Sequence, residues 1–162
     1  MDIFDDEILL LWSTLEKYQV RYIMIGGFAV NMHKHYRTTN DIDLYVQDNN
    51  TNRKQLGIAL QELKLSTTEI IERMQFIPGW SSISLMSGFP LDIMTSVKGL
   101  EYLSFDECYE VASCVEIESV TVKFLHLNHL LESKRAANRP KDQIDVLALE
   151  EIKKTRQERG EM

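Results

Sequence analysis

Two adjacent glycines between two patterned segments constrain the fold of this chain more than any other feature. Residues 21–25 favour a strand, and Gly26-Gly27 then allows a sharp turn into a helix over residues 28–36. Residues 41–46 alternate strictly between apolar and polar side chains, which is typical of a strand with one buried face. The segment therefore predicts a strand, a tight turn, a helix and a second strand.

The rest of the chain extends this unit with further helices and strands. Residues 68–76 fit neither the helical nor the strand period, so both alternatives stay open there. The many charges from Glu150 onward predict a frayed end of the last helix. The other expected elements are helices at residues 5–18, 53–65, 106–112, 126–137 and 142–156, a hairpin of strands at 83–86 and 91–95, and strand structure within 115–125.

Length and composition indicate one globular unit. The chain has 162 residues, of which 44% are hydrophobic, enough for one core and too few for two comfortable domains. No apolar stretch reaches the roughly 20 residues of a membrane span, and the acidic start is unlike a signal peptide, so we expect a cytoplasmic protein. Cys108 and Cys114 lie apart from clustered histidines and are expected to be reduced. The net charge of −7 disfavours broad attraction to nucleic acid.

Three aspartates are candidate metal ligands. Asp41 and Asp43 are two residues apart on a predicted strand, so their carboxylates point the same way with Cα atoms about 6–7 Å apart. Asp92 lies between two apolar residues of a later strand, and a neighbouring antiparallel strand could bring it to the first two acids. Carboxylates without matching cations favour Mg²⁺. The alternative is that all three are solvated side chains on exposed strand faces.

The glycine pair is a candidate phosphate site. Gly26-Gly27 permits close approach of another group to the backbone, and the N–H groups at the start of the following helix favour an anion such as a triphosphate. The alternative is an ordinary tight connection between a strand and a helix.

Short motifs spread over the chain form a recognisable set. They are Gly26-Gly27, Arg37-x-Thr39-x-Asp41-Ile42-Asp43-Leu44, Leu91-Asp92-Ile93, Leu130-x-x-x-Lys134 and Arg139-Pro140-Lys141-Asp142-x-x-Asp145. Together they resemble the DNA polymerase beta-like nucleotidyltransferase superfamily, and they are most similar to the branch of abortive-infection toxin and small antibiotic nucleotidyltransferases. The match covers residues 22–95 and, more loosely, the C-terminal helices. Many members have Gly-Ser where this chain has Gly26-Gly27, which removes a hydroxyl contact to phosphate.

This resemblance implies an α+β fold with a nucleotidyltransferase-like mixed β-sheet flanked by helices and followed by C-terminal helices. It implies a single nucleotidyltransferase domain over residues 1–162. Within that domain we expect an N-terminal helix in residues 1–20, an α/β catalytic core in 21–125 and C-terminal helices in 126–162.

The resemblance also implies the chemistry. Asp41, Asp43 and Asp92 would hold two Mg²⁺ ions and move a nucleoside monophosphate from an NTP, expected to be ATP, to an acceptor hydroxyl with release of pyrophosphate. Asp92 would be either a general base or only a metal ligand. The implied nucleotide-binding residues are Gly26, Gly27, Arg37, Thr39, Lys134 and Lys141.

Several roles have alternatives. Lys134 and Lys141 would neutralise phosphate charge, and Arg37 would either do the same or pair with a neighbouring acid. The alternative for all three cations is a solvated surface position, and Lys141 could instead form a local helix pair with Asp145. Asp142 and Asp145 would orient the lysines or the acceptor.

The acceptor and the partners stay open at this point. The acceptor could be tRNA or another nucleic acid, a protein or a small molecule, and a homodimer or a protein partner could supply contacts to it, because only about 40 residues follow the sheet. A different class of function is a non-catalytic, antitoxin-like binding module that acts through a protein partner. The three acids argue against that module, because unpaired carboxylates facing one cleft would give it no advantage.

Overall fold

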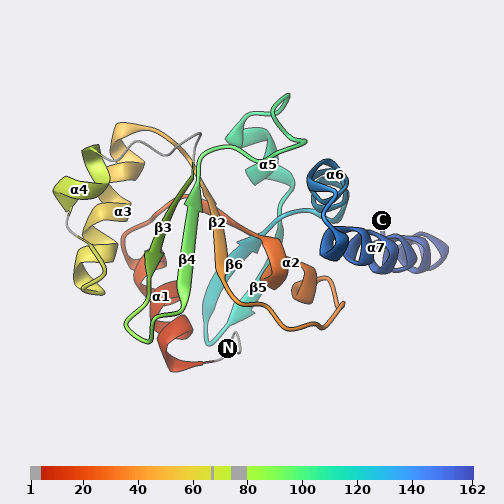
Figure 1. The fold of residues 1–162 in the computed structure, drawn as a ribbon, viewed down its shortest axis with the longest axis horizontal. Coiled ribbons are helices and arrows are strands. Elements are labelled where there is room, and N and C mark those ends of the chain that lie inside the picture. Colours follow the sequence, from red (N-terminus) through yellow and green to blue (C-terminus); the bar gives the residue numbers. More distant parts are fainter. Residues whose placement is uncertain (1–4, 67, 74–79) are drawn as a thin grey trace.

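A six-stranded mixed sheet in the order β3-β4-β2-β1-β6-β5 organises the chain (Figure 1). The computed structural model describes residues 5–66, 68–73 and 80–162. The strands are β1 (Tyr22–Ile25), β2 (Ile42–Val46), β3 (Trp80–Ser84), β4 (Pro90–Met94), β5 (Ser113–Ile117) and β6 (Val120–Phe124). The helices are α1 (Asp6–Lys17), α2 (Gly26–Met32), α3 (Asn50–Glu62), α4 (Thr68–Arg73), α5 (Phe105–Val111), α6 (Leu127–Ala137) and α7 (Pro140–Glu158). The predicted α+β fold with C-terminal helices is confirmed.

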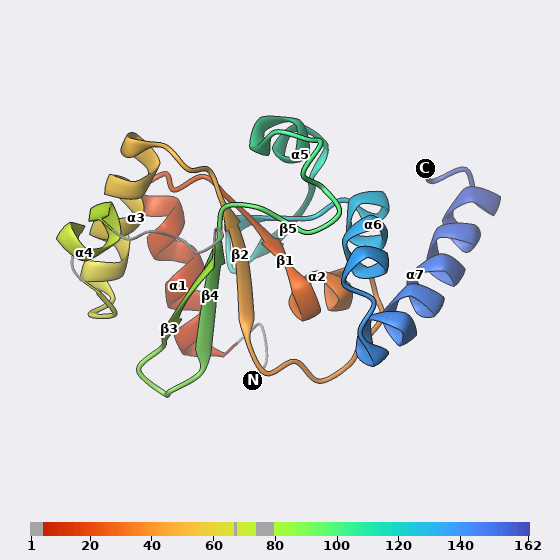
Figure 2. The same ribbon diagram turned by 45° about the horizontal axis from the view of Figure 1, so that its top comes forward.

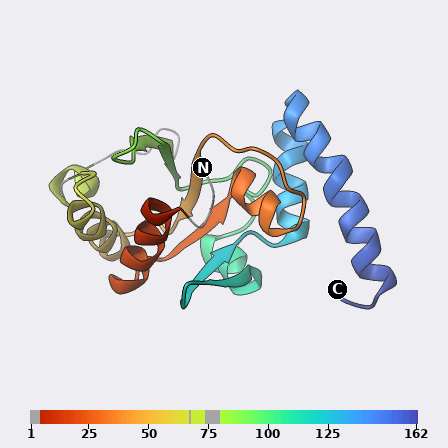
Figure 3. The same ribbon diagram turned by 90° about the horizontal axis from the view of Figure 1, so that it is seen from below.

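Helices lie on both sides of this sheet. The views from two directions place α1, α3 and α4 on one side and α2, α6 and α7 on the other (Figures 2 and 3). Ile8, Leu11, Trp12 and Leu15 of α1 are completely buried, because their spacing puts all four on one helix face. Each such side chain contributes roughly 1.5–3 kcal/mol through burial. None of the described helices combines the length and the apolar composition needed to cross a bilayer.

The strand pattern of β2 is reflected in burial at the start of the strand, whereas Tyr45, on the predicted polar face, is also buried. Ile42 and Leu44 are completely buried, whereas Asp43 between them is only half-buried on the opposite face. β1 pairs with β2 in antiparallel register, which sets Ile25 opposite Asp43. The start of β2 therefore lies beside the glycine turn that follows β1.

The pairing of β4 corrects one expectation. β4 runs parallel to β2, with Asp43 opposite Asp92, whereas we expected an antiparallel neighbour. The reason is that β3, the first strand of the predicted hairpin, lies at the edge and runs antiparallel to β4, so the second strand, β4, pairs with β2 in the parallel direction. The parallel register still places Asp92 next to Asp43, because the parity of side chains along a strand does not depend on strand direction.

Element ends differ from the predicted ones in several places; β3, for example, is Trp80–Ser84 rather than residues 83–86. α2 starts at Gly26 and ends at Met32, soon before Lys34 adopts a positive φ of 77°. α3 starts at Asn50, since the side chain of Asn49 caps it. α7 does not fray at Glu150 but continues to Glu158, because Leu149 is buried and Ile152 packs against the core.

The segment without a clear period forms a helix where it is described. Residues Thr68–Arg73 are α4, and the rest of that segment, residues 74–76, lies outside the described residues. The β-branched region at 115–125 is a hairpin of β5 and β6, turned by Glu118 and Ser119 with positive φ values of 50° and 70°.

Candidate active site

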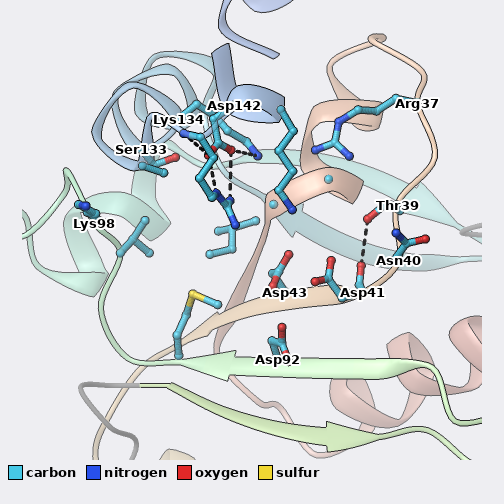
Figure 4. Close-up of a pocket in the computed structure, with 18 of the residues that line it drawn as sticks. Arg37, Thr39, Asn40, Asp41, Asp43, Asp92, Lys98, Ser133, Lys134 and Asp142 are labelled. Atoms are coloured by element: carbon cyan, nitrogen blue, oxygen red, sulfur yellow. Dashed lines mark hydrogen bonds and ion pairs between the residues drawn. The ribbon is translucent and has the colours of Figure 1, made fainter. Parts of the chain in front are cut away.

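Three carboxylates converge on the face of the sheet that carries α2, α6 and α7. Asp41 precedes β2, Asp43 lies within it, and Asp92 lies opposite Asp43 in β4. One oxygen from each carboxylate lies within 4.8 Å of the others, and all three side chains are half-buried (Figure 4). Asp41, Asp43 and Asp92 form a set of hard oxygen ligands that fits a divalent cation such as Mg²⁺.

The electrostatics of this cluster also favour a cation. Burial, followed by the charges of Asp41 and Asp92, raises the pKa of the Asp43 carboxyl to about 7, while Lys134 and Lys141 act in the opposite direction. The two lysines therefore do not compensate the burial and the like charges. A bound divalent cation would stabilise the ionised form of all three acids.

The glycine turn is shaped by this cluster. Gly26 has a φ of +67°, and a Cβ atom there would lie 2.0 Å from Oδ2 of Asp43. A Cβ atom on Gly27 would lie 2.5 Å from Oγ1 of Thr39. Both positions exclude a side chain because the Asp43 and Thr39 side chains occupy the space, so the turn and the acids come into direct contact.

A cleft of about 670 Å³ lies over the acids between the sheet and the two C-terminal helices. Every residue predicted for the site lines it: the two glycines, Arg37, Thr39, the three acids, Lys134 and Lys141. Thr39 donates a hydrogen bond of 3.2 Å to the carbonyl of Asp41 and is itself buried. The structure thus brings together residues from four separate parts of the chain.

Two of the predicted phosphate-binding cations are already held by acids of α7. The guanidinium of Arg37 donates two hydrogen bonds to Asp145, of 2.7 and 2.8 Å. Nζ of Lys134 lies 3.2 Å from Asp142 and 3.1 Å from Asp145. Both carboxylates are completely buried, and Lys134 is 6% exposed. The structure thus pairs Arg37 with an acid and places Lys134 between Asp142 and Asp145, while the roles of these residues toward a nucleotide stay predictions.

The pairing of Lys141 with Asp145 is not found. The ion pairs of Asp145 in the described chain go to Arg37 and Lys134, and His35 lies 3.9 Å away. Lys141 instead lines the cleft and acts on the charge of Asp43. The spacing of Lys141 and Asp145 on one helix suggested a local pair. Both carboxylate oxygens of Asp145 instead accept hydrogen bonds from Arg37, which is distant in the sequence.

These ion pairs keep the two buried acids ionised. Burial alone would raise the pKa of Asp142, but hydrogen bonds from Arg139 and the charge of Lys134 lower it to about 2. Burial would also raise the pKa of Asp145, but hydrogen bonds from Arg37 and Lys134, together with their charges, lower it. The network joins the loop that precedes β2 to α6 and α7 by charge-assisted hydrogen bonds.

Several lining residues carried no motif in the sequence. Met94, Val97 and Lys98 follow Asp92 at the end of β4, and Ser133 lies beside Lys134 in α6. Asn40 also lines the cleft, and its position directly before Asp41 is the one sequence feature that could have predicted this. A loop that reaches a cleft through packing leaves no periodic pattern.

Comparison with known proteins identifies the family. A family model described as "Nucleotidyltransferase of unknown function (DUF6036)" matches residues 1–158. The chain belongs to this nucleotidyltransferase family. It is therefore a transferase enzyme, and the resemblance that the motifs suggested is confirmed. No curated protein matches the chain.

Solved structures show that the fold of this nucleotidyltransferase is shared with two antibiotic nucleotidyltransferases and with a putative nucleotidyltransferase. The lincosamide antibiotic adenylyltransferase LnuA, solved with lincomycin bound, has a TM-score of 0.64 at 16% identity, over 91% of this chain and 97% of its own. ANT(2")-Ia in complex with adenylyl-2"-tobramycin has a TM-score of 0.59 at 17% identity, over 88% and 84%. A putative nucleotidyltransferase from Thermotoga maritima has a TM-score of 0.54 at 14% identity, over 94% and 89%.

Proposed function

We propose that the chain transfers a nucleoside monophosphate from an NTP, with ATP as the expected donor, to an acceptor hydroxyl and releases pyrophosphate in a Mg²⁺-dependent reaction. The observation that supports this most directly is the convergence of Asp41, Asp43 and Asp92 in a chain of a nucleotidyltransferase family. Two Mg²⁺ ions, when bound, would supply charge for the departing pyrophosphate and acidify the acceptor hydroxyl.

The three acids would have different roles because they lie at different positions. Asp41 and Asp43, from one strand edge, would hold the ions on the side of the glycine turn. Asp92, from the neighbouring strand, would complete the ligand set or accept the proton of the acceptor hydroxyl. The high pKa of Asp43 means that this carboxyl must lose its proton when the site is loaded.

The cleft around the glycine turn would receive the triphosphate. Gly26 and Gly27 leave the backbone accessible, and the Thr39 hydroxyl can donate to a phosphate oxygen because its present bond to Asp41 is long, at 3.2 Å. Lys141 would neutralise phosphate directly. Arg37 and Lys134 would contribute positive charge from fixed positions, since Asp142 and Asp145 already hold them.

For the acceptor, a small molecule has the best support. LnuA is solved with lincomycin and ANT(2")-Ia with an adenylylated tobramycin, and both share this fold. tRNA and protein acceptors, a homodimer, and a role in a toxin–antitoxin system remain predictions from the resemblance.

The proposal is tested with purified protein, Mg²⁺, each labelled NTP and a panel of RNA, protein and small-molecule acceptors. We expect Mg²⁺-dependent label transfer that Asp43→Asn reduces to background, because that carboxylate is a metal ligand. Asp6→Asn, an exposed acid of α1 outside the cleft, is the matched control and should keep full transfer. Failure to bind any NTP in calorimetry, together with a copurifying protein, would favour the non-catalytic binding module instead.

A further inference from the structure

The cationic side chains of the cleft are not equally available to a substrate. In the described part of the chain, Arg37, Lys134 and Arg139 are each engaged by Asp142 or Asp145. Lys98 and Lys141 also line the cleft and form no ion pair with any residue in the described ranges. Two cations therefore face the cleft without an anionic partner.

These two lysines serve different regions of the cleft. Lys141 is one of the charges that act on Asp43, so it lies near the metal-binding acids. Lys98 is not among those charges. Figure 4 shows Lys98 and Ser133 on one side of the acids, and Arg37, Thr39 and Asn40 on the other. Lys98 thus lies away from the region proposed for the triphosphate.

The backbone around Lys98 is held in place by α6. Gly99 has a φ of +91°, and a Cβ atom there would lie 2.8 Å from Cβ of Ala136 and 2.9 Å from the carbonyl of Glu132. The amide of Leu100 donates to the carbonyl of Val97 in a 3.0 Å turn. Close packing fixes this turn at the rim of the cleft, so Lys98 extends from a defined position.

No acid in the described lining is available for a cationic group. Asp41, Asp43 and Asp92 are the proposed metal ligands. Asp142 is completely buried and forms ion pairs with Lys134 and Arg139. The lining near Lys98 is instead apolar, with Met94 and Val97. A polycationic amino sugar would therefore meet free positive charge and no free carboxylate, which is unfavourable.

We propose that the acceptor is a small hydroxylated molecule with an anionic group, a phosphate or a carboxylate, that pairs with Lys98 while its carbon skeleton rests on Met94 and Val97. This inference rests on the proposed nucleotidyl transfer and adds the charge class of its acceptor. The net charge of −7 disfavours a nucleic acid as the acceptor, because its binding requires an extended positive surface.

The test uses four probes that share a hydroxylated six-membered ring and differ in charge: glucose 6-phosphate, glucuronate, glucose and glucosamine. Binding is measured by ligand-observed NMR on protein loaded with Mg²⁺ and a non-hydrolysable ATP analogue. We expect the better of the two anionic probes to bind about tenfold more tightly than glucose, and glucosamine to bind weakest. The two anionic probes distinguish a phosphate site from a carboxylate site.

Variants of Lys98 make the test specific. Lys98→Gln should remove the tenfold preference, and Lys98→Glu should reverse it in favour of glucosamine. Lys54→Gln, at an exposed lysine of α3 outside the cleft lining, should leave the preference unchanged. Equal binding of all probes, no binding of any probe, or a preference that survives Lys98→Gln would each overturn the assignment.

A separate measurement distinguishes this inference from the proposed function. Calorimetry with the ATP analogue and Mg²⁺ comes first, and its failure would contradict nucleotidyl transfer itself. If the nucleotide binds to the wild type and equally to Lys98→Gln, the probe series tests the acceptor site alone. Weaker nucleotide binding by Lys98→Gln would place this lysine at the nucleotide and would overturn its role toward the acceptor.

Discussion

At the scale of single residues, Asp43 has the most unusual environment in the candidate site. Its carboxyl lies between two other acids, and a pKa of about 7 leaves it partly protonated at neutral pH. Its partner in packing is Gly26, whose missing side chain is the space that the carboxylate fills. The Asp43 carboxylate therefore keeps its position only because residue 26 is a glycine.

The raised pKa of Asp43 predicts a pH dependence of stability. An unfolded aspartate titrates near pH 4, so between about pH 4 and 7 the folded protein binds more protons at this site, and its share of the stability falls as pH rises. The loss is on the order of 4 kcal/mol for three pKa units, as an upper bound. Urea unfolding at pH 5 and pH 8 should show a smaller difference for Asp43→Asn than for the wild type. Equal differences would contradict the raised pKa.

Gly26→Ala should destabilise the protein strongly. The new methyl group would collide with Asp43, and the residue would keep a positive φ that alanine disfavours, so we expect a loss of about 3 kcal/mol or more in the free energy of unfolding. Gly88→Ala is the control, because Gly88 has a φ of +89° but no atom within 4 Å of the added Cβ. It should lose only about 1 kcal/mol. Similar losses for the two variants would argue against the close packing at Asp43.

At the scale of elements, α7 connects to the loop before β2 through buried charge. Asp145 of α7 accepts two hydrogen bonds from Arg37 of the loop and lies 3.1 Å from Lys134 of α6. The loop that these contacts hold continues into Thr39 and Asp41. Asp145 therefore helps to position the candidate metal site, although it does not line the described cleft.

Asp145→Asn should cost about 3 kcal/mol of stability, because it leaves the buried Lys134 and the half-buried Arg37 with less compensating charge. Asp145→Asn combined with Lys134→Met should recover part of that loss, since the second change removes an uncompensated cation. Chemical denaturation of both single variants and the double variant measures the coupling. Glu151→Gln, at an exposed site of α7, is the control, and strictly additive losses would contradict the proposed coupling.

At the scale of the whole molecule, the candidate site lies between the sheet and the C-terminal helices, so a bound ligand would join these two parts. Cleft residues come from β1, α2, β2, β4, α6 and the start of α7. A nucleotide held there would therefore contact both the sheet and the C-terminal helices. The organisation as a single domain over residues 1–162 stays a prediction. A ligand that binds only the folded state stabilises it by mass action.

Mg²⁺ with ATP should raise the melting temperature by roughly 5–10 °C at a hundredfold excess over the dissociation constant, equivalent to about 2.7 kcal/mol. The shift should be larger at pH 8 than at pH 5.5, because cation binding must displace the proton of Asp43 at lower pH. Thermal melts of the wild type and Asp41→Asn measure this effect. A shift of equal size in the variant would contradict the assigned metal ligands.

Local patterns in the sequence determined most elements and one side of the site. The apolar spacing of α1 and the alternation of residues 41–46 depend only on neighbouring residues, and the structure keeps the first throughout and the second up to Leu44. The position of Asp92 beside Asp43 was also predicted, although with the wrong strand direction, because side-chain parity is the same in parallel and antiparallel pairs.

Only the tertiary structure decided which charges are paired and which are free. Arg37 and Asp145 lie 108 residues apart, and no local rule links them, so their contact depends on how α7 packs beside the loop before β2. The same packing leaves Lys98 without an ion pair among the described residues and buries Lys134 with two acids. Periodicity specifies the face on which a residue lies, whereas the distance between two faces is set by the packing of the whole fold.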